Sequence, residues 1–267
     1  MFWQRLNLLL LLALLGACSS APKEPIPALR MAVHDSHSKA LRAIRQEDLA
    51  SAAEYWQQTL LRYQALDDWQ GQGQARLGLA QAQQKRGQLE AAQGTLKPLL
   101  AQVLFGEAIR AQAYLQLAMI SLPDAGVAAM YLAESERLCA KPCALQWAQL
   151  NLAAKIAASK LDWPRVAAIS RQLLATAPAT ERAEIAHAHR LQALALLRQQ
   201  QAGGALPHIQ AALELDRVLA KPAWLIEDYR LQLEIAIALG DEALQQESGQ
   251  RLQSVCQAVR CDPADLR

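Results

Sequence analysis

Small and apolar residues recur along this chain in one frame, at intervals of 36 to 40 residues. Within each occurrence they are spaced three and four residues apart, which places them on one face of a helix. The frame comprises Leu49, Ala52 and Trp56; Leu89, Ala92 and Leu96; Ala125, Ala128 and Leu132; Trp163, Val166 and Ser170; and Ala202, Ala205 and Ile209. A sixth, degenerate occurrence runs from Gly240 to Leu252. The pattern predicts a recurring amphipathic helix.

A polar or glycine-containing turn precedes each of these helices. The turns are Gln46-Glu47-Asp48, Arg86-Gly87-Gln88, Pro123-Asp124, Leu161-Asp162, Gln200-Gln201 and Gly240-Asp241. Another helical pattern precedes each turn, so the repeating unit is predicted to be a helix–turn–helix. A small residue early in the second helix lets it approach the first closely, and a larger apolar residue one turn later fills the remaining space. We therefore expect an all-α fold of about six helical hairpins.

This frame resembles the tetratricopeptide repeat across roughly residues 33–260. The best matches are Gly87-Gln88-Leu89-Glu90-Ala91-Ala92 and Ala211-Ala212-Leu213-Glu214-Leu215-Asp216. The spacing exceeds the 34 residues of that family. The glycine and tyrosine of its first helix are mostly missing here, and its closing proline is displaced. A HEAT-like array, with a period of about 40 to 47 residues, and a plain helical bundle are the alternatives.

Composition supports the all-α prediction. Apolar residues make up 52% of the 267 residues but aromatic residues only 5%, so the apolar content is chiefly alanine and leucine. Both are strong helix formers, whereas the residues that favour strands are sparse. The formal net charge is +2 and no basic run is present, so the sequence offers no electrostatic footprint for nucleic acid or for a membrane surface.

The N-terminus has the features of a lipoprotein signal peptide over residues 1–17. Met1 to Arg5 form a short cationic start, and the apolar run from Leu8 to Leu15 is too short to cross a bilayer. The run ends in Leu15-Gly16-Ala17-Cys18, which resembles the bacterial lipobox. That resemblance implies cleavage before Cys18, acylation of its thiol and usually of the new amine, and stable anchoring by two or three acyl chains. An ordinary secretory peptide is the alternative.

Residues 18–32 are predicted to be a tether behind the lipidated Cys18. Pro22, Pro25 and Pro27 disfavour a helix and favour extended chain. Ser19 follows the cysteine, and the absence of aspartate there implies, by resemblance to proteobacterial lipoproteins, the periplasmic face of the outer membrane. Residues 33–267 then form the helical repeat domain.

Four further cysteines are expected to pair locally. An exported chain meets an oxidising environment, and an even number of cysteines suggests disulfide bonds. Because repeat units contact only their neighbours, we expect Cys139–Cys143 and Cys256–Cys261. A four-cysteine zinc site or a redox pair is the alternative, but neither spacing is CxxC, and a zinc site would need the two distant pairs to meet.

No pattern in the chain predicts catalysis, a metal site or a cofactor. Nucleotide-binding loops, serine elbows and HExxH sequences are missing from it. His187 and His189 are two residues apart and point to different sides of a helix, and His34 and His37 lie near the tether with no carboxylate fixed beside them. We expect these side chains to be solvated or to lie at helix ends.

A groove is the remaining candidate site. In tetratricopeptide arrays the first helix of each unit lines the concave face, and this resemblance places six residues towards it: Arg110, Asn151, Lys155, His187, Arg190 and Arg230. Such a polar, partly basic lining suits an extended peptide or its C-terminal carboxylate. A merely hydrated face is the alternative.

Two classes of function follow from the sequence. The first is a lipid-anchored, non-enzymatic adaptor that binds protein partners of the cell envelope, because lipoproteins with such repeats serve in pilus or secretin assembly, in barrel assembly and in the regulation of cell-wall enzymes. The second is an envelope enzyme that acts on peptidoglycan. A carboxylate pair or metal cluster in one pocket would favour the enzyme, and a long groove would favour the adaptor.

Overall fold

The computed structural model of the protein describes residues 27–261. The expected signal peptide at residues 1–17, the lipid-attachment residue Cys18 and most of the tether lie outside the described residues. Within residues 27–261 the chain forms twelve α-helices and one short 3₁₀-helix, and no strand. The all-α prediction is confirmed.

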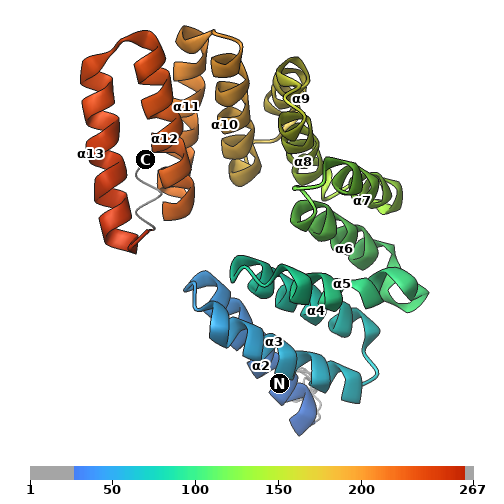
Figure 1. Ribbon diagram of the computed structural model, residues 1–267. Helices are drawn as coiled ribbons and strands as arrows, with labels where there is room; N and C mark the ends of the chain where they lie inside the picture. The colour runs from blue at the N-terminus through green and yellow to red at the C-terminus, as the bar shows by residue number, and fades with distance from the viewer. Residues whose placement is uncertain (1–26, 262–267) are drawn as a thin grey trace, which may run out of the picture.

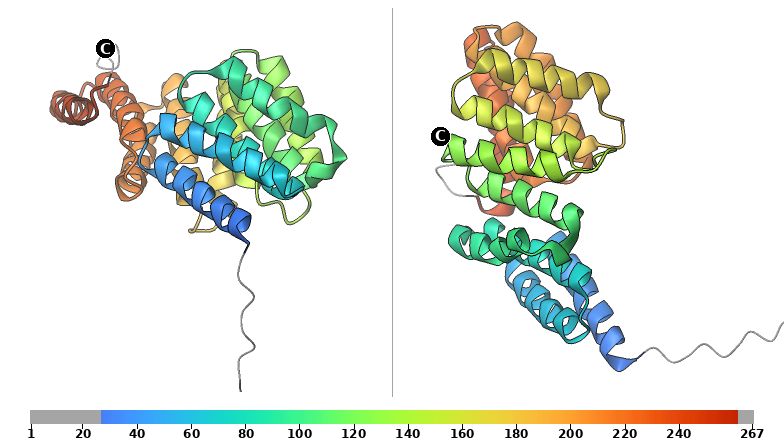
Figure 2. Two further views of the ribbon diagram at one scale, coloured as in Figure 1. Left: turned by 90° about the horizontal axis from the view of Figure 1, so that it is seen from below. Right: turned by 90° about the vertical axis from the view of Figure 1, so that its right-hand side faces the viewer.

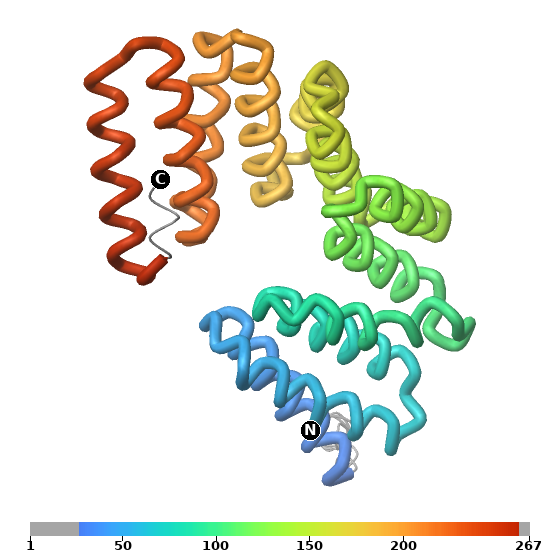
Figure 3. The backbone as a smooth tube through the Cα atoms, in the orientation of Figure 1, coloured from blue at the N-terminus to red at the C-terminus, as the bar shows by residue number. Residues whose placement is uncertain are grey.

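The helices form six successive antiparallel hairpins, as the repeat frame predicts (Figure 1). Their bounds are α2 (Ala28–Arg45) with α3 (Leu49–Ala65), α4 (Trp69–Lys85) with α5 (Leu89–Ala101), α6 (Gly106–Ile120) with α7 (Ala125–Leu138), α8 (Gln146–Ser159) with α9 (Trp163–Thr176), α10 (Arg182–Arg198) with α11 (Ala202–Val218), and α12 (Pro222–Leu239) with α13 (Glu242–Val259). The 3₁₀-helix η1 (Val103–Phe105) joins α5 to α6. The backbone trace bends into an open arc, with the first and last hairpins at its two ends (Figure 3).

The second helix of each of the first five hairpins begins at the first residue of the expected frame. The small positions of the frame are enclosed completely, since Ala52, Ala92, Ala128 and Ala205 have no exposed surface. The third residue of the frame, one turn later, is also buried in each of these five hairpins, although in the fourth it is the small polar Ser170. The frame therefore marks the contact between the two helices of a hairpin.

Backbone geometry and capping explain the turns. At the turn from α8 to α9, Leu161 adopts a left-handed conformation with φ 58°, and Asp162 then accepts a hydrogen bond from the backbone N–H of Arg165. Gly240 and Asp241 do the same before α13, where φ is 68°. One left-handed residue followed by an aspartate N-cap ends one helix and starts the next within three residues.

Two glycines in α4 allow aromatic rings to lie against its backbone. A Cβ atom at Gly71 would come within 2.2 Å of the Tyr63 ring, and one at Gly78 within 2.3 Å of the Trp56 ring. Both rings belong to α3, so these glycines set the close approach of the first hairpin to the second.

The helical domain begins earlier than the sequence indicated. The first helix α2 starts at Ala28, whereas residues 28–32 were expected to continue the tether. The last proline, Pro27, occupies the N-cap position, where its fixed φ and missing N–H do no harm. Pro27 therefore does not prevent a helix from starting at the next residue.

The two expected cysteine pairs lie at disulfide distance. The Cα atoms of Cys139 and Cys143 are 5.4 Å apart, and those of Cys256 and Cys261 are 4.9 Å apart. Each pair sits at the end of a second helix, where it closes a short loop. Loops this small contribute little loop-closure entropy, so the pairs fix local geometry rather than global stability.

Each hairpin completes its core with the first helix of the next one. One cluster joins Ala128 and Leu132 of α7 to Leu152 and Ile156 of α8, and equivalent clusters recur along the array. Seen from the side, the hairpins stack in sequence order (Figure 2). None of the helices described has the length and apolar character that crossing a bilayer requires.

Enlarging the small residue of the frame should destabilise the array. Ala92→Leu places extra carbon atoms in a completely enclosed contact and is expected to lower the free energy of unfolding by about 1–3 kcal/mol. The matched control is Ala91→Leu, at the adjacent exposed position, which should change it by less than about 0.5 kcal/mol. Denaturant unfolding measures both. Equal stability of the two variants would contradict the proposed role of the frame.

Candidate first-helix groove

The first helices of consecutive hairpins contact one another from α4 through α12 and form a continuous surface. We call this surface the first-helix face, and it is represented by Gln74, Gln81, Gln112, Gln116, Asn151, Lys155, His187 and Arg190. Its two halves differ in chemistry. Amide side chains dominate the half nearer the N-terminus, and charged side chains dominate the other.

The N-terminal half holds a glutamine-lined hollow of about 320 Å³. Its lining includes Gln74 and Gln81 of α4 and Gln112 and Gln116 of α6, together with His37 and Trp56 of the first hairpin. Gln116 donates a hydrogen bond to the carbonyl of Leu77 at 3.4 Å, which ties the two helices together. Side-chain amides both donate and accept, so this surface suits the backbone of an extended peptide.

The C-terminal half is organised around Arg190 of α10. Its guanidinium donates to Asp216 of α11 and to Asp228 of α12, the latter at 2.5 Å, and lies 3.4 Å from Glu227. It also donates to Nδ1 of His187 at 2.8 Å. We call these five residues the Arg190 cluster. It joins three helices from two hairpins; Asp216 and Asp228 are completely buried and Arg190 nearly so, whereas Glu227 is exposed.

Burial changes the protonation of the cluster. Burial raises the pKa of Asp216 and raises that of Asp228 to about 7, against the opposing effect of Arg190. Burial also lowers the pKa of His187 to about 3, with further contributions from Lys155 and Arg190. His187 is therefore neutral near neutral pH and accepts from Arg190, and the two aspartates share less than two full charges.

Lys155 of α8 forms no ion pair or hydrogen bond with another described residue. Burial lowers its pKa, while Glu227 and Glu184 favour its charge. Beside it, Asn151 donates to the carbonyl of Glu184 at 2.9 Å and to its carboxylate at 2.6 Å. Trp224 packs edge-on against His187, with ring centroids 4.5 Å apart. Lys155, Asn151 and the His187–Trp224 pair therefore give this region both polar and aromatic character.

The structure thus brings together four of the six residues expected in the groove: Asn151, Lys155, His187 and Arg190. Arg110 lies apart on α6, where its Nε is buried without a hydrogen-bond partner. Arg230 lies on α12 and is half-buried. Contrary to the expected basic lining, Arg190 is engaged by acids of the protein itself.

Sequence reasoning missed those acids. Asp216 and Asp228 are completely buried, and Asp216 ends one of the two motifs that match the repeat family best. The sequence signal that could have identified Asp216 is its position on an otherwise apolar helix face, after Ala212 and Leu213 and before the next turn. A buried carboxylate requires a charged or hydrogen-bonding partner, but its spacing from Arg190 along the chain does not identify that partner.

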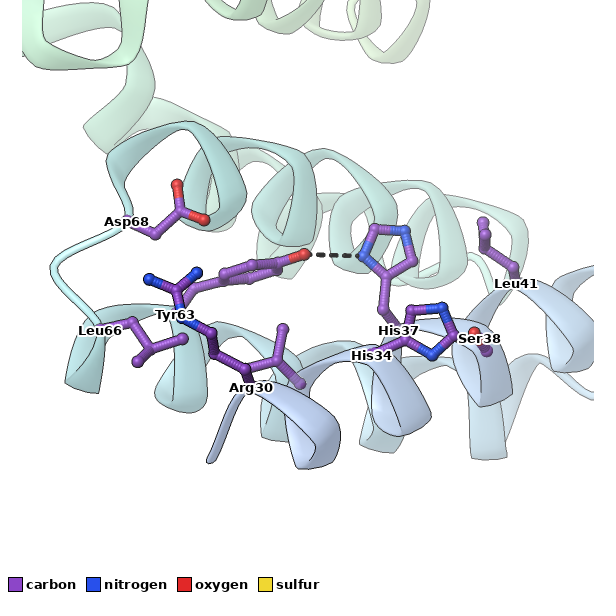
Figure 4. A pocket seen from close by; sticks show the side chains of 9 residues that line it. Arg30, His34, His37, Ser38, Leu41, Tyr63, Leu66 and Asp68 are labelled. Carbon is purple, nitrogen blue, oxygen red and sulfur yellow. Dashed lines mark hydrogen bonds between the residues drawn. The ribbon is translucent and has the colours of Figure 1, made fainter. Parts of the chain in front are cut away.

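A second hollow, of about 420 Å³, lies at the N-terminal end of the array and shares His37 with the glutamine-lined hollow (Figure 4). It lies between α2 and the turn from α3 to α4. His37 and Tyr63 form its centre, with His37 Nδ1 and the Tyr63 hydroxyl 3.1 Å apart and hydrogen-bonded. His37 also packs edge-on against Trp56 at 4.9 Å. Arg30 and His34 line the side of this hollow formed by α2.

The described residues offer little for covalent or metal chemistry. No group of three or more His, Cys, Asp or Glu side chains within residues 27–261 is arranged to hold a metal ion. His189 and His208 approach through their Nδ1 atoms at 3.0 Å, and burial lowers the pKa of His189 to about 4. This pair joins α10 to α11, and we interpret it as a packing contact between the two helices.

The hairpins, their frame and their continuous first-helix surface define a tetratricopeptide-like solenoid scaffold. No family model matches the chain, and no curated protein matches it. Solved structures do. The crystal structure of PilW, described as a widely conserved type IV pilus biogenesis factor, matches with a TM-score of 0.60 at 16% identity, covering 89% of this chain and 100% of that chain. The crystal structure of BtubC (BKLC) from P. vanneervenii matches with a TM-score of 0.59 at 15% identity, covering 89% and 94%. At these identities the likeness concerns the fold.

The buried aspartates should make stability depend on pH in a defined direction. Folded Asp228, with a pKa of about 7, holds a proton that the unfolded chain releases near pH 3.8, so its contribution to stability falls as pH rises between these values. His187, lowered from 6.5 to about 3, acts in the opposite direction over a similar range. Asp228→Asn removes only the first effect, so the stability of this variant relative to wild type should increase from about pH 4 to about pH 8.

Thermal unfolding of both proteins across this range measures the difference. The exposed Glu234 lies on the same helix, and Glu234→Gln should show no comparable change. A constant difference between Asp228→Asn and wild type at every pH would contradict the raised pKa.

Proposed function

We propose that this protein is a lipid-anchored adaptor on the periplasmic face of the outer membrane, and that it holds a protein partner along its first-helix face during assembly of an envelope machine. Pilus or secretin assembly, barrel assembly and regulation of cell-wall enzymes are the processes that suit such an adaptor. The likeness of the fold to PilW favours the first of these. No cofactor is required.

The proposal rests on the two chemically different halves of the first-helix face, one rich in amides and one charged. Glutamines of α4 and α6 offer paired donors and acceptors to an extended backbone, while Lys155 offers a positive charge further along. A peptide that lies along the helices would place its amides on the glutamines and a carboxylate near Lys155. Because Arg190 is occupied by Asp216 and Asp228, Lys155 is the better candidate for that carboxylate.

The anchoring half of the proposal depends on Cys18. The lipobox-like Leu15-Gly16-Ala17-Cys18 supports it, together with the short apolar run that precedes it. The helical domain starts at Ala28, so a short segment would separate the solenoid from the acylated cysteine. A scaffold held this close to the membrane meets its partners at high local concentration.

Changing the acylated residue should release the protein from the membrane. Cys18→Ser removes the thiol that would carry the diacylglycerol, so metabolic labelling with a radioactive or clickable fatty acid should be lost completely. The variant is expected to accumulate as uncleaved precursor or as free periplasmic protein. Fractionation of cells that express either form provides the second measurement. Equal labelling and equal membrane partition of Cys18→Ser and wild type would refute the anchor.

Partner capture should map to the first-helix face. A photo-crosslinking amino acid placed at Gln112 or Lys155 in growing cells is expected to yield one recurrent envelope protein, because both side chains lie on this face. The matched control is the same amino acid at exposed Gln172 on the second helix α9. Mass spectrometry identifies the product. Crosslinking from Gln172 to that same protein, with none from Gln112 and Lys155, would refute the proposed face.

A further inference from the structure

The first helix of the array presents a surface that no neighbouring hairpin covers. Residues Val33, Ser36, Ala40 and Ala43 of α2 are buried, and the opposite side of the helix is exposed. We call this exposed side the end face, and it comprises Arg30, Met31, His34, Asp35, Leu41, Arg42 and Arg45. It combines cations with apolar side chains, since Met31 is 55% exposed and Leu41 41%.

The end face is positively charged. Helix α2 contains four basic residues and one acid, Asp35, and Asp35 pairs with Lys39 at 2.8 Å. The other three, Arg30, Arg42 and Arg45, form no ion pair with any residue that the structure describes. The whole chain has a formal net charge of only +2, so the positive charge is concentrated on this helix.

The hollow beside His37 extends this surface inward. Arg30, His34, His37, Ser38 and Tyr63 surround its 420 Å³ and contribute hydrogen-bond donors. Asp68 is the acid among its lining residues, and its carboxylate already accepts from the backbone N–H of Gly71 at 2.8 Å. Guanidinium, imidazole and hydroxyl groups around one opening suit a phosphate ester.

From these observations we propose that the end face binds the surface of a membrane that contains anionic phospholipids. The inference rests on the anchored adaptor proposed above, because Cys18 and Pro27 are only nine positions apart, which limits their separation to about 30 Å. The anchor therefore keeps α2 within reach of lipid headgroups. The three arginines contact their phosphates, and Met31 and Leu41 enter the interfacial region. The solenoid is thereby oriented on the membrane as well as tethered to it.

The test uses the chain from Ser19 onward, which has no acylation site. Among the described residues, every buried core residue and both cysteine pairs lie between Val33 and Cys261, so this chain retains the packing that holds the solenoid together. It is mixed with vesicles of phosphatidylcholine alone or of phosphatidylcholine with phosphatidylglycerol, and bound protein is measured by co-sedimentation. Binding is expected only to the second kind and should weaken as salt increases.

Matched variants assign the binding to the end face. The first triple variant carries Arg30→Gln, Arg42→Gln and Arg45→Gln. Its binding to the phosphatidylglycerol vesicles should be weaker by roughly fivefold per arginine, on the order of a hundredfold in total. The control triple variant carries Arg86→Gln, Arg165→Gln and Arg182→Gln, at exposed positions outside the end face. It changes the net charge by the same amount and should retain most of the binding. Circular dichroism verifies that both triple variants remain folded.

The outcomes separate this inference from the anchor. Equal binding to both vesicles, or an equal loss in the two triple variants, overturns the role of the end face even if Cys18 is labelled with lipid. Concentration-dependent dimers that are abolished only by the end-face variant would identify a second copy as the occupant instead, and would also overturn it. Selective binding to phosphatidylglycerol vesicles supports it even if Cys18 proves unlabelled, in which case only the anchor fails.

Discussion

The close contact between the two helices of a hairpin is the constraint on which this structure depends. An alanine with no exposed surface, at Ala52, Ala92, Ala128 or Ala205, sits at that contact in four of the hairpins. A hairpin formed in this way still has an uncovered apolar side, which only the first helix of the next hairpin can cover. The small side chain therefore lets the two helices of a hairpin pack closely, and the hairpin that results needs the next hairpin to cover its apolar side.

The sequence was sufficient to predict the fold because its signals are local. The frame of small residues, the polar turns and the aspartate N-caps all act within about ten residues, and each second helix begins where this frame indicates. The start of α2 was predicted too late because the prolines were taken to exclude a helix beyond Pro27. The close approaches at Gly71 and Gly78 were also missed, since a glycine within a helix does not reveal which ring will lie against it.

The site could be predicted only in part. Asn151, Lys155, His187 and Arg190 do share one region, because residues at the same helical frame of consecutive first helices must lie on the same side of the array. Their state of charge was not predictable, since it depends on Asp216 and Asp228, which arrive from two other helices. The burial of a side chain and its ion pairs depend on residues from other helices. The charge of a groove residue therefore cannot be predicted from the sequence of its own helix alone.

The Arg190 cluster also has a mechanical consequence. A scaffold anchored at one end and loaded by a partner at the other carries force through its hairpins in series. The ion pairs of Arg190 join α10, α11 and α12, and they must be broken together before the last two hairpins can separate. Among the described residues no comparable buried ion cluster joins the first two hairpins. If the chain is anchored through Cys18 as proposed, we expect tension to extend the hairpins nearest the anchor before the hairpins beyond α9 separate.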